Sequence, residues 1–221
     1  MGILYVVSTP IGNLKDITLR ALEILKTVDV IACEDTRVTK RLLDHYQIVT
    51  PTVSYHQHSK VGKVDFLISK LQSGKHVALV SDAGTPGISD PGGLLVASAV
   101  AEGITVESVP GASALTAALA LSGFPTDRFT FFGFLPHKKG RETLIKKIIE
   151  SDHTVVFYES VHRIIKALEQ LIAAGLTRQI VVARELTKKF ETVYRGTAQE
   201  VLNNITNEET KGEFVVVIGN K

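Results

Sequence analysis

The sequence predicts an α/β protein with two lobes, a mostly parallel sheet in the N-terminal lobe and a mixed sheet in the C-terminal lobe. Short apolar runs rich in β-branched residues alternate with segments of helical periodicity along most of the 221 residues. This order is typical of parallel sheets, because each strand returns through a helix to run in the same direction. Near the C-terminal end, strands follow one another through shorter connections, which indicates a mixed sheet.

The N-terminal lobe begins with an apolar run that predicts a strand, and strands and helices then alternate. The helix at 61–72 carries apolar residues at positions 64, 67, 68 and 71, so one of its faces is predicted to be buried. The helix at 114–121 is rich in Ala and Leu on most sides, which predicts burial all round. The expected strands are 3–7, 28–33, 51–55, 75–80 and 105–109, and the expected helices are 19–26, 38–46, 61–72, 94–101 and 114–121.

The segment 122–127 is the best candidate for a linker, because it combines Gly123 and Pro125 with polar residues. We therefore expect an N-terminal lobe at 1–123 and a C-terminal lobe at 124–221, in which the alternation restarts. The expected strands of the second lobe are 129–134, 154–158, 179–184, 191–196 and 213–219, and its expected helices are 141–150, 163–174 and 198–204.

Composition sets broad limits on the class of protein. Hydrophobic residues make up 44% and charged residues 22%, which is ordinary for a soluble globular chain. The formal net charge of +2 gives no argument for nucleic-acid binding from bulk charge. The single cysteine, Cys33, excludes an internal disulfide and fits a cytoplasmic location. No run is long and apolar enough to suggest a membrane span, so we expect no membrane partner.

The most distinctive segment is residues 81–93, called here the glycine loop, which contains four glycines and two prolines. It follows a predicted core strand, where such a loop lets backbone groups approach a ligand closely. The chain has neither the glycine fingerprint of dinucleotide sites nor that of a triphosphate-binding loop. Asp82 and Asp90 lie near its two ends, which favours a cationic or hydroxyl-bearing ligand over a polyphosphate.

Four loops follow predicted strands of the first lobe, at 8–16, 34–37, 81–93 and 110–113. Ligands of open α/β sheets bind outside the carboxyl ends of the strands, so these loops are expected to converge on one site. Helix capping is the alternative for single residues, and Asp16 and Thr36 are the candidates for it.

The loop sequences resemble the motif set of the tetrapyrrole methylase superfamily and, within it, the branch that methylates ribosomal RNA. The resemblance spans essentially the whole chain, and it is carried by residues 8–14, 34–37, 81–92, 109–114, 132–136, 159–163, 184–191 and 211–215. It implies the two-lobed fold of these methylases, a homodimer, and S-adenosylmethionine bound in a cleft between the lobes. It also implies 2′-O-methylation of the ribose of a cytidine in 16S RNA, with the 30S subunit as partner.

Carried over motif by motif, the resemblance implies a set of cofactor-binding residues in both lobes. The expected contacts are Pro10, Asp82, Ala83, Gly84, Thr85, Ser113, Ala114, Tyr158, Ala183, Gly212 and Glu213. Methyl transfer from a sulfonium needs no metal, since the methyl carbon is already activated and the enzyme has to align the reactants.

A ribose hydroxyl is a weak nucleophile while it keeps its proton, so a general base is expected. The sequence leaves the choice open between several groups, and we favour Glu34 and Asp35 as catalytic residues, with Arg37 holding a phosphate. The other candidates for the base are Glu159, Glu185, Glu191 and His56.

RNA binding is expected from local basic clusters, with Lys138, Lys139, Arg141 and Lys188 as the candidate contacts. Lys146 and Lys147 are better explained as a solvated helix face. His56 and His58 lack a carboxylate or cysteine at ligand spacing, so no metal site is expected. Two alternatives stay open: a methyltransferase for a tetrapyrrole or other small substrate, and a non-catalytic RNA-binding module.

Overall fold

The computed structural model describes residues 1–56, 61–206 and 212–221, and it divides into two compact units, Met1–Ser113 and Ala114–Lys221. The division falls one helix before the boundary expected after residue 123. The reason is the packing of α5 (Ala114–Ser122), which contacts strands β7 and β10 of the second unit. Arg195 strengthens the attachment, because its guanidinium donates hydrogen bonds to the carbonyls of Leu121 and Ser122, the latter at 3.0 Å.

The first unit contains a five-stranded sheet in the order β3-β2-β4-β1-β5. All of its strand pairs are parallel, so the expectation of a mostly parallel sheet is confirmed. The two central strands β2 and β4 are rich in Val, Ile or Ala and fully buried, as strands of parallel sheets are. The strands are β1 (Ile3–Val7), β2 (Val30–Cys33), β3 (Thr52–Ser54), β4 (Val77–Val80) and β5 (Thr105–Val109).

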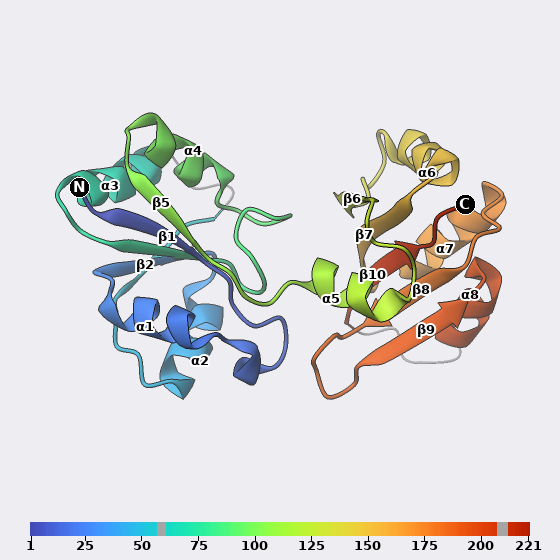
Figure 1. Ribbon diagram of the computed structural model, residues 1–221, viewed down its shortest axis with the longest axis horizontal. Coiled ribbons are helices and arrows are strands. Elements are labelled where there is room, and N and C mark those ends of the chain that lie inside the picture. Colours follow the sequence, from blue (N-terminus) through green and yellow to red (C-terminus); the bar gives the residue numbers. More distant parts are fainter. Residues whose placement is uncertain (57–60, 207–211) are drawn as a thin grey trace. The chain divides into compact units, whose positions relative to one another are not determined.

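Helices cover both faces of this sheet (Figure 1). Alternate strand residues supply the two cores: Leu4 and Leu79 face α3 and α4, whereas Val7 and Val80 face α1 and α2. The helices are α1 (Leu19–Thr27), α2 (Thr36–His45), α3 (Val61–Gln72) and α4 (Gly93–Ala101), with a short 3₁₀ helix, η1 (Leu14–Asp16), after β1.

The helix caps in the first unit differ from those expected. The hydroxyl of Thr18 accepts from the amide of Ala21 and caps α1, so Asp16 is not its cap. The carboxylate of Asp35 accepts from the amide of Arg37 and caps α2, which places Thr36 inside the helix. Helix α2 therefore starts two residues earlier than the position predicted from its apolar periodicity.

The second unit contains a mixed sheet, which confirms the prediction from the sequence. Its strand order is β6-β7-β10-β8-β9. Strand β6 runs parallel to β7, and the other three pairs are antiparallel. Its strands are β6 (Phe129–Phe134), β7 (Thr154–Ser160), β8 (Ile180–Arg184), β9 (Thr192–Gly196) and β10 (Glu213–Ile218), and its other helices are α6 (Arg141–Glu150), α7 (Ile164–Ala173) and α8 (Ala198–Thr206).

One face of the mixed sheet packs against α6, α7 and α8 to form the core of the second unit. Phe157, Val182 and Phe214 belong to this core. Because side chains alternate along a strand, their neighbours Tyr158, Ala183 and Val215 lie on the opposite face. Strand register aligns these three in one row, since Val215 pairs with both Tyr158 and Ala183.

Candidate active site

The loops after β1 and β4 are joined by backbone hydrogen bonds at the carboxyl end of the parallel sheet. The amide of Thr9 donates to the carbonyl of Gly84 at 2.9 Å, and the amide of Gly84 donates back to Thr9 at 3.0 Å. The hydroxyls of Ser8 and Thr85 share a further hydrogen bond of 2.8 Å. The loop beginning at residue 8 and the glycine loop therefore form one connected wall.

The loop after β5 packs onto the same wall. A Cβ added to Gly111 would lie 3.0 Å from Cβ of Ser8, so the absence of a side chain at Gly111 allows this close approach. Thr85 donates to the carbonyl of Ala112 at 3.5 Å. This hydrogen bond brings Thr85 close to Ser113, another residue expected to bind the cofactor.

The five expected cofactor residues of the first unit before Ser113 belong to this wall. Asp82 and Ala83 are exposed, Thr85 is half-buried, and Pro10 and Gly84 are buried. The parts of this wall that are open to a ligand are therefore Asp82, Ala83 and Thr85.

The loop after β2 joins the wall through Asp82. A carboxylate oxygen of Asp82 accepts from the amide of Asp35 at 3.0 Å. Desolvation of its carboxyl group raises the pKa of Asp82, and the neighbouring charge of Asp35 raises it further. Burial likewise raises the pKa of Glu34, and the negative charge of Asp82 adds to the effect. The convergence of all four loops expected from the strand ends is thus present within this unit.

Asp35 has the opposite electrostatic environment from Glu34. Its carboxylate binds the Arg37 guanidinium at 2.6 Å and caps α2, and these hydrogen bonds lower its pKa to about 2. A carboxylate with so low a pKa is a weak proton acceptor near neutral pH. Arg37 remains 88% exposed, so its ion pair is open to competition from another anion.

A cavity of about 530 Å³ lies beside Glu34, between the loop after β2 and the end of the glycine loop. Gly92 shapes it: its φ is 139°, and a Cβ there would lie 3.1 Å from the side chain of Leu79 and 3.3 Å from the amide nitrogen of Gly87. Its lining is Glu34, Tyr55, His56, Gly87, Ser89, Asp90, Pro91, Gly92, Gly93 and Leu94.

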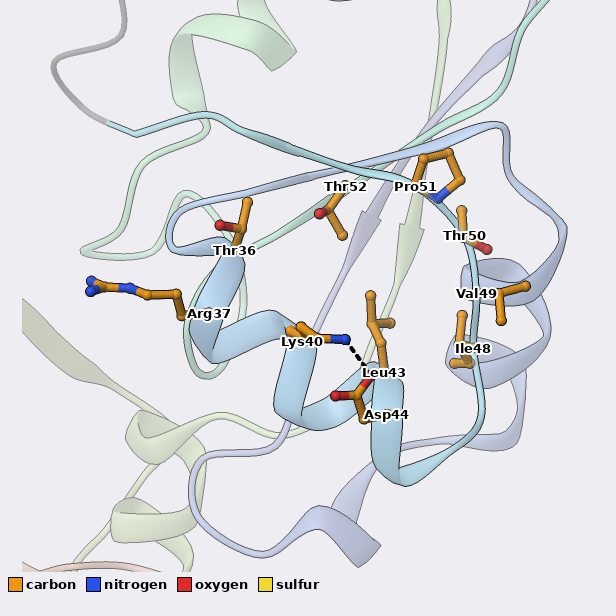
Figure 2. Close-up of a pocket in the computed structure, with 10 residues that line it drawn as sticks. All are labelled: Thr36, Arg37, Lys40, Leu43, Asp44, Ile48, Val49, Thr50, Pro51 and Thr52. Carbon is orange, nitrogen blue, oxygen red and sulfur yellow. Dashed lines mark hydrogen bonds and ion pairs between the residues drawn. The ribbon is translucent and has the colours of Figure 1, made fainter.

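A second cavity of about 470 Å³ lies between α2 and the chain that leads into β3 (Figure 2). Lys40 points toward Asp44 and binds its carboxylate at 2.8 Å, whereas Arg37 projects away from the other lining residues. Thr36, Thr50 and Thr52 also line it. The two basic residues that line this cavity are therefore both ion-paired, Lys40 with Asp44 and Arg37 with Asp35.

In the second unit, the expected cofactor residues occupy the ends of three neighbouring strands. The ring of Tyr158 contacts those of Phe131 and Phe134, with centroids 4.9 and 5.4 Å away. Ala183 is fully buried, so its side chain is closed to solvent. Val215 of β10 lies between Tyr158 and Ala183. Glu213 lies two residues before Val215 in the same strand and pairs with Ser160.

Gly212 and Glu185 are in close contact. The amide of Glu213 donates to Glu185 at 3.0 Å, and a Cβ on Gly212 would lie only 2.4 Å from the Glu185 side chain. Lys188 binds Glu185 at 2.8 Å and Glu213 at 3.1 Å. Burial opposes ionisation of Glu185, but the hydrogen bonds from Lys188 and Glu213 outweigh it and lower its pKa.

Of the four residues expected to bind RNA, two are exposed and two bind groups of the protein itself. Lys138 and Lys139 are exposed, as a phosphate contact requires. Arg141 is only 5% exposed, and its guanidinium binds Gln170, the Pro136 carbonyl and Glu159, so the expectation that it meets RNA is wrong. Lys188 is half-buried within the carboxylate pair described above.

The structure also contains a buried charge cluster that the sequence did not predict. Glu159 is completely buried between two arginines, with oxygen–nitrogen distances of 3.2 Å to Arg141 and 2.7 Å to Arg163. Arg163 also donates to the Leu135 carbonyl at 2.9 Å. The cluster thereby fixes the chain after β6, and an arginine opening α6 opposite a glutamate in β7 was its only sequence signal.

Three of the remaining candidates for a general base have structural roles, whereas His56 stays a candidate. Glu159 is enclosed by arginines, Glu185 holds Lys188, and Glu191 accepts from the amide of Thr187 at 2.6 Å. His56 lines the cavity beside Glu34, and His58 lies outside the described residues. Within the described ranges, no group of three or more His, Cys, Asp or Glu side chains is placed to hold a metal ion.

Comparison with known proteins identifies relatives over nearly the full chain. The family model described as Tetrapyrrole (Corrin/Porphyrin) Methylases matches residues 3–202. A protein of Synechocystis named ribosomal RNA small subunit methyltransferase I is 52% identical over 99% of this chain and 79% of its own length. Proteins with the same name from Escherichia coli O157:H7 and Thermotoga maritima are 48% and 43% identical, over 77% and 100% of their lengths and 98% and 100% of this chain.

Solved structures with little sequence similarity share the fold. A diphthine synthase superposes with a TM-score of 0.76 at 20% identity, over 99% of this chain and 90% of its own. A cobalt precorrin-4 methyltransferase gives a TM-score of 0.72 at 20% identity, over 98% and 94% of the two chains.

In the part of the chain that the structure describes, no helix has the length and apolar character needed to span a membrane.

Proposed function

Because this chain belongs to the tetrapyrrole (corrin/porphyrin) methylase family, we propose that it transfers a methyl group from S-adenosylmethionine to the RNA of the small ribosomal subunit. The acceptor is the 2′-hydroxyl of a cytidine ribose. The proposal is supported by near full-length identity of 43–52% to proteins named ribosomal RNA small subunit methyltransferase I.

The wall built by the loops of the first unit suits S-adenosylmethionine, which supplies an activated methyl group on a cationic sulfonium. Asp82 offers a carboxylate to its positive groups, and Thr85 offers a hydroxyl. Pro10 and Gly84 are buried, so their proposed role is to support this wall. In the second unit, the proposed contacts are Ala114, Tyr158, Gly212 and Glu213, and the burial of Ala183 limits it to a supporting role.

Glu34 is the proposed acceptor of the ribose proton. Burial and the charge of Asp82 raise its pKa, which makes it a stronger base than an ordinary glutamate. It also lines a cavity large enough for a nucleotide. Asp35 serves instead to cap α2 and to orient Arg37, whose exposed guanidinium is proposed to exchange Asp35 for an RNA phosphate.

The RNA backbone is proposed to meet the exposed Lys138 and Lys139 after β6. Arg141 acts from inside the fold, because it holds this segment through the Pro136 carbonyl. The cytoplasm is the proposed location, since that is where a ribosomal substrate is found, and a homodimer is the proposed assembly.

Transfer of labelled methyl from S-adenosylmethionine tests the proposal, with 30S subunits, naked 16S RNA and uroporphyrinogen offered as separate acceptors. We expect label in the RNA of at least one of the first two acceptors. Label in the macrocycle alone would assign a tetrapyrrole methyltransferase. Absence of cofactor binding at millimolar concentration in calorimetry would instead favour a non-catalytic RNA-binding module.

A further inference from the structure

The cavity beside Glu34 has chemistry that the transfer reaction does not by itself explain. Its lining combines the apolar residues Pro91 and Leu94 with hydrogen-bonding groups at Glu34 and Ser89. Leu94 is 60% exposed although it is a large apolar side chain. Leu94 therefore gives the lining of the cavity an apolar surface that is open to a ligand.

The size and charge of the cavity restrict the class of ligand. Its volume of about 530 Å³ lies within the usual range for small-molecule sites. Glu34 and Asp90 both line it, and Arg37 and Lys40 line a different cavity. A phosphate would meet carboxylates here, so the lining favours a neutral group that donates hydrogen bonds.

We propose that this cavity holds the base of the target cytidine when the nucleotide is turned out of its RNA strand. The inference rests on the proposed function, because it assumes that an RNA nucleotide is the acceptor. Enzymes that modify nucleotides commonly extrude them into pockets, and proteins read single-stranded RNA by stacking and by contacts to base edges. The exocyclic amine of cytosine is a donor that a carboxylate in the lining accepts.

Gly93 is a position in the cavity lining at which a side chain can be added without a close contact at Cβ. It is the first residue of α4, it lines the cavity, and a Cβ added to it would have no neighbour within 4 Å. Gly62 in α3 is a matched control, because a Cβ there is equally free and Gly62 does not line the cavity. Both positions lie in helices of the same unit.

The experiment compares wild type, Gly93→Ala, Gly93→Phe and Gly62→Phe with 30S subunits as acceptor. We expect kcat/KM for the subunits to fall about tenfold or more in Gly93→Phe, with a smaller loss in Gly93→Ala and none in Gly62→Phe. Affinity for S-adenosylmethionine, measured by calorimetry, is expected to stay within about twofold of wild type, which also reports a folded site.

A change in the RNA completes the test without relying on the folding of a variant. Placing an abasic nucleotide at the target position removes the group that the cavity is proposed to hold. The wild type should then slow by about the factor seen for Gly93→Phe, and Gly93→Phe should slow no further on this RNA, because the two changes remove the same interaction. Independent losses that multiply would overturn the proposal.

The other outcomes are equally decisive. Unchanged kcat/KM in Gly93→Phe would overturn the base pocket while leaving the proposed methyltransferase intact. Weakened cofactor binding in Gly93→Phe would assign the cavity to S-adenosylmethionine and would also overturn it. A wild-type chain that binds the cofactor but labels no RNA would contradict the proposed function itself.

Discussion

Glu34 and Asp35 are adjacent in sequence, yet their carboxyl groups have opposite electrostatic environments. Glu34 is half-buried near Asp82, which raises its pKa, whereas Asp35 holds Arg37 and the first turn of α2, which lowers its pKa to about 2. The sequence predicted a catalytic role for both. The geometry separates their roles. The environment of Glu34 favours a group that accepts protons, and the environment of Asp35 favours a carboxylate that stays ionised.

The pH dependence of transfer tests the role of Glu34. A base must be ionised, so kcat/KM should fall as the pH decreases through the raised pKa of Glu34, at a higher pH than for an ordinary glutamate. Asp82→Asn removes a like charge and should shift this limb to lower pH. Glu34→Gln should reduce kcat by about 10²- to 10⁴-fold and abolish the limb.

The exposed Glu23 of α1 supplies the control for this experiment, since Glu23→Gln removes a similar carboxylate outside the site. It should keep the wild-type rate and profile. An unchanged acidic limb in Glu34→Gln would show that another group accepts the proton.

A substitution at Gly212 tests whether the second unit contributes to binding of S-adenosylmethionine. Its φ is 110°, and a methyl group at this position would collide with Glu185, which accepts from the amide of Glu213. Gly212→Ala should therefore displace Glu185 and weaken binding of S-adenosylmethionine, measured by calorimetry. Gly175→Ala controls for backbone strain alone, because Gly175 also has a positive φ of 84° but open space around its Cβ. Equal affinities in the two variants would contradict a role for Gly212 in the site.

At the scale of elements, the sequence predicted the order and type of nearly every strand and helix. Its boundaries erred where a tertiary contact decides the end of an element. Strand β7 continues to Ser160 because that residue pairs with Glu213 of β10, which is distant in sequence. The convergence of the loops could be predicted from the positions of the strand ends. The cavity and the burial of Arg141 could not be predicted from the sequence, because both depend on side chains that packing brings together.

The buried cluster of Glu159, Arg141 and Arg163 holds the segment after β6 to β7 and α7. Removing its only carboxylate leaves two arginines without their charge partner in the core of the unit. Glu159→Gln should lower the free energy of unfolding by about 3–5 kcal/mol, measured by urea denaturation. Glu150→Gln breaks an exposed pair with Lys146 and should cost less than about 1 kcal/mol. Equal losses in the two variants would argue against a special role for the buried cluster.

At the scale of the whole molecule, a net charge of +2 requires RNA affinity to come from local positive charge. Lys138→Ala combined with Lys139→Ala should weaken binding to 16S RNA and reduce the slope of log affinity against log salt by about one for each phosphate that is no longer neutralised. The double variant of Lys146 and Lys147, on the exposed side of α6, should retain the wild-type slope. The same slope in both double variants would exclude the segment after β6 from the RNA surface.

The proposed activity is tested most directly by the identity of the methylated nucleoside. The 30S subunits treated with the chain and S-adenosylmethionine would be digested to nucleosides and analysed by mass spectrometry. We predict one new product, 2′-O-methylcytidine, from 16S RNA, formed more slowly by about 10²- to 10⁴-fold when Glu34→Gln replaces the wild type. A methyl group on the base of the nucleoside, or no methylated nucleoside at all, would contradict the account.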